Sequence, residues 1–207
     1  MRDPFREGLA AGWKHIDASQ LAVDLPIEAD VVIIGSGAGG GVTAEILAAN
    51  GLKVVIVEEG PLRTSSDFKM REAEAYPDLY QESAARKTAD KAINILQGRC
   101  VGGSTTVNWT SSFRTPPRTL QWWQSAWGLK RLGVDAMAPW FAAMEQRLHV
   151  GLWPIPPNEN NAALARGAAQ LGVPVAVIPR NAELCWTLGS CGMGCPTNAK
   201  QSMLVTT

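Results

Sequence analysis

Residues 30–60 read DVVIIGSGAGGGVTAEILAANGLKVVIVEEG, and this stretch decides the fold. Two short apolar runs rich in β-branched residues, 31–34 and 53–57, predict strands that are buried on both faces of a parallel sheet. The segment 42–50 between them predicts a helix, and Gly51 suits the position that follows a helix end. The order strand, helix, strand therefore predicts an α/β fold.

Three glycines lie between the first strand and the helix in the spacing G-x-G-x-x-G. Gly35 permits the tight turn, Gly37 lets a pyrophosphate approach the backbone, and Gly40, with Ala44, lets the helix pack close to the strand. The start of the helix offers free N–H groups and the positive end of its dipole to phosphates. These features predict a Rossmann-like dinucleotide-binding unit.

Glu58 follows the second strand, 23 residues after Gly35. A carboxylate at this position can accept hydrogen bonds from both ribose hydroxyls of a dinucleotide and disfavours a 2′-phosphate, which argues against NADP. The neighbouring Glu59 is more typical of a solvated loop acid, although it is an alternative ribose ligand. The motif by itself does not separate FAD from NAD.

A second glycine-rich stretch, GRCVGGSTTVNW, covers residues 98–109. We expect a short strand over 93–96 to lead into this loop and no helix to follow it, which makes the loop a poor phosphate site. Its glycines and small hydroxyl residues would instead let the backbone approach a flat ring closely. A nicotinamide enzyme needs no second loop at this distance, so the stretch favours FAD.

Together these motifs resemble the glucose–methanol–choline (GMC) oxidoreductases, FAD enzymes that oxidise alcohols. The first loop with VEEG resembles their N-terminal FAD motif, and GRCVGGSTTVN resembles their first signature. QWWQSAWGL followed by MAPWFAAMEQRL, and CGMGCPTNAKQSML, resemble further segments, so that the similarity covers about residues 28–207. One departure is Ser112, where the family usually has an aromatic residue or alanine.

The resemblance implies the roles of two sets of residues. Gly35, Gly37, Gly40 and Glu58 would hold the ADP half of FAD. The residues that would line the flavin side are Arg99, Gly102, Gly103, Ser104, Thr105 and Asn108. An exposed arginine is the alternative interpretation of Arg99, and Cys100 is expected to be a buried small residue and not a reactive thiol.

The resemblance also implies that a Rossmann-like FAD-binding domain of the GMC type is followed by the beginning of a substrate-side α+β domain. We expect the chain to be a truncated N-terminal part of a longer protein, because it stops in a rising apolar segment without a cap. The expected ranges are a leader over 1–29, the first part of the FAD-binding domain over 30–116, and an incomplete region over 117–207 that continues it and starts the substrate side.

Cys185, Cys191 and Cys195 follow the pattern C-x5-C-x3-C-P. Three thiolates in one loop could hold a three-iron iron–sulfur cluster. The glycines around the last two cysteines also suit a tight loop, so structural cysteines or a disulfide are the favoured alternative.

Four further elements are expected along the chain. Residues 63–79 predict a mobile connection with one short helix, broken at Pro77. Asp135 is expected to cap a helix whose apolar stripe packs in the core, residues 161–171 predict another helix, and 173–179 predict a strand. The stripe consists of Met137, Trp140, Phe141, Met144 and Leu148.

The 207 residues carry 19 basic and 19 acidic side chains, which indicates no nucleic-acid partner. No signal peptide is recognised and no apolar run of about 18 residues occurs, so we expect no transmembrane segment and a cytoplasmic or peripheral membrane protein. The resemblance implies an alcohol as the substrate. It leaves open whether oxygen or an electron-acceptor protein is reduced.

In the family, the general base is a histidine near the C-terminus of a chain two to three times this length. His15 is expected on the surface and His149 at a helix end, so neither is assigned a catalytic role. We therefore expect a GMC-type oxidoreductase segment that is inactive alone. Another FAD flavoprotein and a non-enzymatic dinucleotide-binding module are the alternatives.

Overall fold

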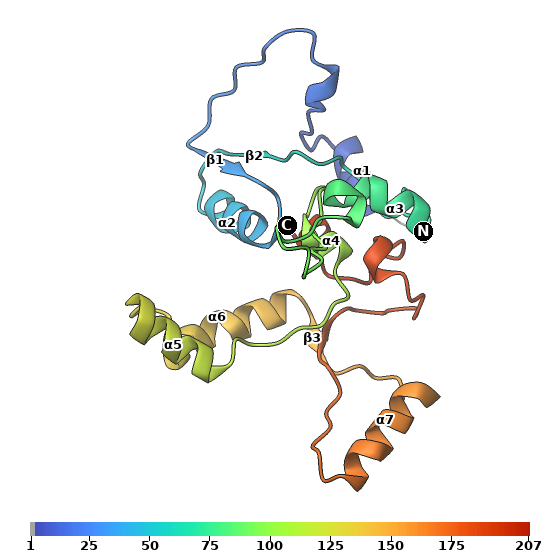
Figure 1. Cartoon of the computed structure of the whole chain (residues 1–207). Helices are drawn as coiled ribbons and strands as arrows, with labels where there is room; N and C mark the ends of the chain where they lie inside the picture. The colour runs from blue at the N-terminus through green and yellow to red at the C-terminus, as the bar shows by residue number, and fades with distance from the viewer. Residues whose placement is uncertain (1–2) are drawn as a thin grey trace. The chain divides into compact units, whose positions relative to one another are not determined.

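The strand–helix–strand pattern is present in the computed structural model, which describes residues 3–207. β1 (Val31–Ile34) and β2 (Val54–Val57) form a parallel pair in which Val31 lies opposite Val54 and Ile34 opposite Val57. α2 (Ala38–Ala49) connects the two strands (Figure 1). The predicted α/β pattern is confirmed at this level.

The helix α2 begins four residues earlier than the sequence predicts, directly after Gly37. A Cβ atom at Gly40 would collide with the carbonyl oxygen of Gly35, and one at Gly41 would lie 2.8 Å from the sulfur of Met203. Because a larger residue would not fit at these two positions, the first turn of α2 is rich in glycine, although glycine is a weak helix former. At the other end, Asn50 is the last capping residue and Gly51 has a φ of +85°, as predicted.

The expectation that both faces of the strands are buried is wrong for the part of the chain that the structure describes. Val32 and Ile34 are 60% and 89% exposed. Val32 and Ile34 point to the same face of β1, so this face carries no covering layer in the described residues. Within residues 3–207, β1 and β2 also pair only with each other.

The described chain divides into two units, residues up to 109 together with 183–207, and residues 110–182. In the first unit a core gathers around α3, α4 and the chain end, formed by Phe68, Ala75, Leu79, Tyr80, Cys100, Val107 and Leu204. The helical segments of this unit, besides α2, are α1 (Pro4–Ala10), η1 (Ala18–Gln20), α3 (Glu72–Leu79), η2 (Gln81–Ala84), α4 (Ser104–Val107), η3 (Cys191–Met193) and α8 (Met203–Thr206). The domain ranges expected from the sequence stay a prediction.

Two expectations in the first unit are wrong. Pro77 does not break the helix of 63–79 but lies inside α3, near its end. Residues 93–96 do not form a strand, because their segment folds back locally with one isolated bridge between Lys87 and Asn94. Ile93 and Leu96 are both more than 60% exposed, so this apolar run has no sheet to join.

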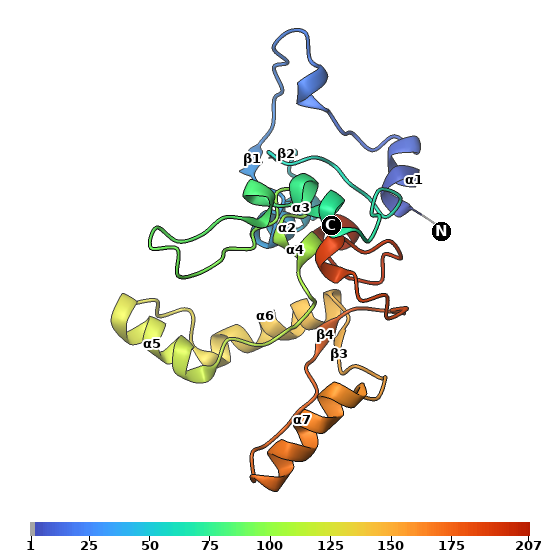
Figure 2. The same cartoon turned by 45° about the vertical axis from the view of Figure 1, so that its right-hand side comes forward.

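The second unit contains α5 (Pro117–Trp127), α6 (Val134–Arg147), β3 (Val150–Gly151), α7 (Glu159–Gln170) and β4 (Arg180–Asn181). β3 and β4 pair antiparallel, and Figure 2 labels both strands. The predicted helix 161–171 is confirmed as α7, which Asn158 caps with its side chain. The predicted strand 173–179 is wrong: residues 173–178 are exposed loop, and pairing starts only at Arg180.

The helix α6 corrects two further expectations. Gly133 takes the N-cap position, and Asp135 lies within the first turn instead of capping it. The stripe is half-buried at Met137, Phe141, Met144 and Leu148 and exposed at Trp140, so it is not a fully buried core face in the described residues. Arg114 packs over Phe141 and forms an ion pair with Glu145.

Within residues 3–207, no helix combines the length and apolar character needed to cross a membrane.

Candidate functional site: two glycine loops in contact

The first glycine loop forms the turn between β1 and α2. Gly35 has a φ of +90°, and its backbone N–H donates to the carbonyl of Val57 at 2.7 Å. A Cβ atom added at Gly35 or Gly37 would meet no described atom within 4 Å, so space is open beside the loop. No described side chain caps the first N–H groups of α2. The loop therefore presents unshielded backbone donors to open space.

Glu58 binds the first loop directly. Its Oε2 accepts hydrogen bonds from the backbone N–H of Ser36 at 2.9 Å and from its hydroxyl at 2.6 Å. Its Oε1 accepts the N–H of Gly60 at 2.9 Å. A carboxylate can accept about four such bonds, so Glu58 retains acceptor capacity. Sequence reasoning missed Ser36, although its place between two motif glycines was a signal.

Glu59 and Arg99 lie at the exposed edge of this region. Arg99 Nε lies 3.5 Å from Glu59 Oε2, and both side chains are largely exposed. Gln81 donates to the other oxygen of Glu59. An exposed pair of this kind contributes little to stability. The structure thus brings Arg99 close to the two loops but keeps its side chain at the surface.

The second glycine loop touches the first at two points. The buried N–H of Gly102 donates to the Ser36 hydroxyl at 2.9 Å. Gly103 has a φ of +54°, and a Cβ atom there would lie 2.9 Å from the Cα of Gly37. Only a glycine fits this approach without backbone movement. The structure therefore brings together the two sets of residues that the sequence predicted.

A short helix directly follows the glycines of the second loop, which contradicts the expectation that none does. α4 (Ser104–Val107) begins directly after Gly103. The Ser104 hydroxyl accepts the N–H of Gly98 at 3.0 Å, and the Thr105 hydroxyl donates to the carbonyl of Gly102 at 2.6 Å. The sequence signal was weak because four residues carry no helical periodicity. The hydroxyl side chains thus fix the backbone of the loop from within.

The C-terminal segment is bonded to the same loop. Thr105 accepts the N–H of Met203 at 3.0 Å. Lys200, which is 2% exposed, donates from Nζ to the carbonyl oxygens of Thr106, of Asn108 at 3.1 Å and of Cys191 at 2.8 Å. Burial lowers the pKa of Lys200 from 10.5 to about 8. Sequence reasoning did not identify this residue.

Tyr80 makes a second buried connection between α4 and the cysteine-containing segment. Its hydroxyl donates to the carbonyl of Gly192 at 2.6 Å and lies 3.2 Å from that of Val107. Burial raises the pKa of Tyr80 to about 12. The hydroxyl is therefore neutral across the physiological range and acts as a structural donor.

The four cysteines are free. Cys100 is fully buried, burial raises the pKa of its thiol to about 12, and the expectation of an inert small residue is confirmed. Burial would also raise the pKa of Cys195, but hydrogen bonds from Thr197 and from backbone N–H groups, including that of Lys200, outweigh it and lower the pKa. Residues 3–207 contain no group of three His, Cys, Asp or Glu side chains that could hold a metal ion.

The two histidines lie outside this cluster of contacts. His15 is exposed in the segment before η1, as expected. His149 belongs to the second unit and follows α6, where its backbone N–H donates to the carbonyl of Gln146 at 3.2 Å. Neither histidine is assigned a catalytic role.

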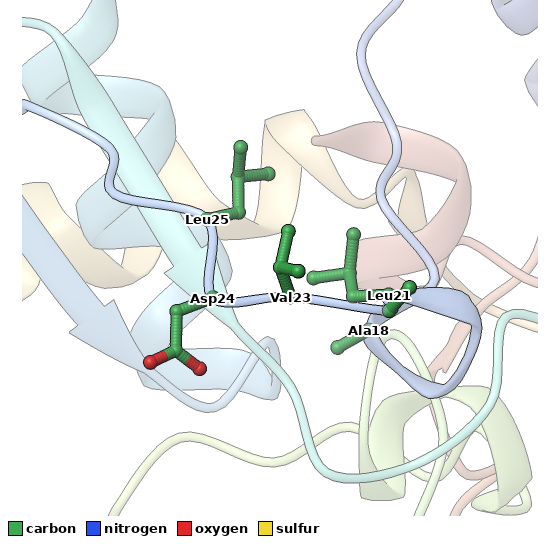
Figure 3. A pocket seen from close by; sticks show the side chains of 6 residues that line it. Ala18, Leu21, Val23, Asp24 and Leu25 are labelled. Carbon is green, nitrogen blue, oxygen red and sulfur yellow. The ribbon is translucent and has the colours of Figure 1, made fainter.

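A shallow hollow in the N-terminal segment is lined by Ala18 and by residues 21–25 (Figure 3). Leu21, Val23 and Leu25 point to one side of this segment, and Asp24 points to the other. No residue of either glycine loop lines the hollow. A single turn of chain with one charged side chain offers no convergent polar groups, so we assign it no ligand.

Comparison with known proteins relates the chain to one family. The family model described as GMC oxidoreductase matches residues 76–207, and a model described as FAD binding domain matches residues 30–70. A long-chain-alcohol oxidase of Arabidopsis thaliana is 35% identical over 177 residues, which cover 86% of this chain and 24% of that protein. A protein of Mycobacterium tuberculosis named as an uncharacterized GMC-type oxidoreductase is 36% identical over 185 residues, 87% of this chain and 29% of that protein.

Among solved structures, the crystal structure of pyridoxine 4-oxidase from Mesorbium loti matches with 30% identity and a TM-score of 0.43, covering 54% of this chain and 23% of that one. The chain thus spans about a quarter of the length of the long-chain-alcohol oxidase of Arabidopsis thaliana.

Proposed function

The chain belongs to the GMC oxidoreductase family, and from this membership we propose that it is the FAD-binding N-terminal portion of an enzyme that oxidises the CH–OH group of an alcohol by hydride transfer to flavin. The observation that carries the proposal is the contact between the two glycine loops, through Gly102 and Ser36 and through Gly103 and Gly37. A single glycine loop would serve any dinucleotide. Two loops in contact can serve the two ends of FAD.

The residues of the first loop fit the ADP half of FAD. Open space at Gly35 and Gly37 and the uncapped start of α2 suit a pyrophosphate, because backbone N–H groups and the helix dipole both favour an anion there. Gly40 allows α2 to start close to the turn. Glu58 would hold the ribose with its remaining acceptor capacity while it keeps its bonds to the loop.

The residues of the second loop fit the flavin side. Gly102 and Gly103 both have positive φ, which places backbone without a Cβ atom against the first loop. Arg99, Ser104 and Asn108 have exposed side chains, and Thr105 fixes the loop through its hydroxyl. We propose that this backbone packs against the flavin and that the exposed polar side chains contact it. When bound, FAD supplies the hydride acceptor, and these residues orient it.

The fold that goes with this function is a Rossmann-like FAD-binding domain of the GMC type, joined to the beginning of a substrate-side α+β domain. The parallel β1–α2–β2 unit supports the Rossmann-like FAD-binding domain.

The substrate of the proposed enzyme is an alcohol, and its oxidised product is a carbonyl compound. We propose a cytoplasmic or peripheral membrane location for the protein.

The test is made on the full-length protein. Purified protein should be yellow, should show the two-band visible spectrum of bound flavin, and should release FAD in a ratio near one per chain after denaturation. An alcohol panel of increasing chain length should bleach this spectrum without oxygen. Colourless protein that takes up no added FAD would refute the proposal, while FAD that no alcohol reduces would leave a flavoprotein of another class.

An iron–sulfur cluster at Cys185, Cys191 and Cys195 is a separate proposal, and it requires these side chains to come together, since the described residues contain no group of three such ligands. Iron and acid-labile sulfide assays on protein purified without oxygen decide it. If iron and sulfide are both absent, the cysteines are structural.

The same preparation, mixed with oxygen or with an electron-carrier protein, shows which acceptor reoxidises the flavin.

A further inference from the structure

Lys200 places a buried ammonium group at the end of the second glycine loop. Its three hydrogen bonds go to carbonyl oxygens of Thr106 and Asn108, on either side of the end of α4, and of Cys191. An ammonium group has three donors, so each proton is used. One side chain thereby fixes the main chain at both ends of the turn that carries Asn108 and ties it to the cysteine-containing segment.

The charge of Lys200 is unusual for its position. Lysine is almost never fully buried unless it is paired, because removing an ammonium from water is costly. The acceptors of its Nζ in the described residues are backbone carbonyls and not carboxylates, and the titratable groups that face it are the thiols of Cys100, Cys191 and Cys195. Three carbonyl acceptors around Nζ take one proton each, which is the pattern that the charged ammonium form satisfies. A positively charged group therefore lies beside the loop.

A connection between α4 and the cysteine-containing segment does not by itself require a charged side chain. Tyr80 already connects the end of α4 to the cysteine-containing segment with a neutral hydroxyl, through the carbonyls of Val107 and Gly192. Lys200 adds two things that Tyr80 lacks, the bond to Asn108 and a positive charge in a poorly solvated place. In such surroundings a charge acts on its neighbours more strongly than in water.

We infer that Lys200 is a positioning residue for the flavin, which holds the main chain at Asn108 in place and whose positive charge favours the reduced cofactor. The inference rests on the proposed function, because it assumes that the second loop packs against the flavin. Reduction adds negative charge to the ring, so a nearby fixed cation makes reduction more favourable. Loss of the cation should make the midpoint potential of the bound flavin more negative.

Three variants of the full-length protein, loaded with FAD, test this. Lys200→Met keeps the length of the side chain and removes the charge and donors, Lys200→Arg keeps the charge, and Tyr80→Phe removes a neutral buried connection between the same segments. FAD content, visible circular dichroism of the bound flavin and its midpoint potential are measured for each. We expect a more negative potential and an altered dichroism in Lys200→Met, and smaller changes in Lys200→Arg. Tyr80→Phe should lose stability with an unchanged potential.

The outcomes separate the two proposals. Wild-type protein that binds no FAD refutes the proposed function itself. Wild-type protein with FAD, together with an unchanged potential and dichroism in Lys200→Met, overturns the role of Lys200 alone, as does an equal potential shift in Tyr80→Phe. If Lys200→Met does not fold, Lys200→Arg is compared with Lys200→Gln. A wild-type midpoint potential in Lys200→Arg and a more negative one in Lys200→Gln support the inference. Equal potentials in these two variants overturn it.

Discussion

The backbone N–H of Gly102, in the second glycine loop, donates a 2.9 Å hydrogen bond to the hydroxyl of Ser36, in the first. The same hydroxyl donates to Glu58 at 2.6 Å. Two loops that are 66 residues apart are therefore one hydrogen-bonded unit with the carboxylate that ends β2. Changes at any of these residues should affect both the stability of the unit and its affinity for FAD.

Replacing Ser36 with alanine should destabilise the protein and weaken FAD binding. The substitution leaves the buried N–H of Gly102 without its acceptor, and an unsatisfied buried donor costs about 1–3 kcal/mol of unfolding free energy. Urea unfolding and FAD content measure the two effects. Ser125→Ala is the control, since Ser125 is exposed and bonds only within α5. Equal unfolding midpoints for both variants would contradict the coupling.

Replacing Gly103 with valine should abolish FAD binding in the full-length protein. The new Cβ would lie 2.9 Å from the Cα of Gly37, so the two loops would have to separate. Gly172→Val is a matched control, because Gly172 also has a left-handed φ, of +67°, but meets no described atom within 4 Å. Both variants carry backbone strain of about 1–3 kcal/mol, and only Gly103→Val should lose flavin. Normal flavin content in Gly103→Val would refute the proposed role of the loop.

Replacing Glu58 with glutamine should weaken FAD binding by at least about tenfold. The amide brings a donor into a site where three donors already converge, and hydrogen bonds to a charged group contribute about 1.5–3 kcal/mol. Titration of apoprotein with FAD, followed by flavin fluorescence, gives the dissociation constant. Glu59→Gln tests the alternative ribose ligand. A larger loss of affinity in Glu59→Gln than in Glu58→Gln would assign that role to Glu59.

Stability should fall in acid as Asp3 is protonated. Burial acts to raise the pKa of Asp3, but hydrogen bonds from the hydroxyls of Ser66 and Thr64 and from backbone N–H groups outweigh it and lower the pKa from 3.8 to about 2. A lowered folded-state pKa means that the stabilisation is complete above about pH 4 and is lost between about pH 4 and pH 2. Unfolding free energy against pH measures this, and Asp3→Asn should flatten the curve over that interval. Parallel curves for wild type and Asp3→Asn would contradict it.

The sequence predicts secondary-structure elements well where their formation depends on neighbouring residues. The glycines of 35–40 belong to a tight turn and a helix start, which depend on neighbouring residues. β1 and β2 follow from short apolar runs rich in β-branched residues, and α2 and α7 follow from their own helical patterns. The errors fall where an apolar run needs a partner from elsewhere in the chain. Residues 93–96 and 173–179 have strand-like composition, but neither meets a sheet in the described residues, and both are exposed.

The sequence by itself determined the first glycine loop, the parallel pair that it joins, the residue types of the second loop and the resemblance to one family. Only the tertiary structure decided that Ser36 connects the two loops and that Lys200 is buried against Thr106, 94 residues away. The physical reason is that spacing along a chain encodes turns and helices, which depend on neighbouring residues. The partner of a buried donor depends on which distant segments are packed together, and no local pattern contains that information.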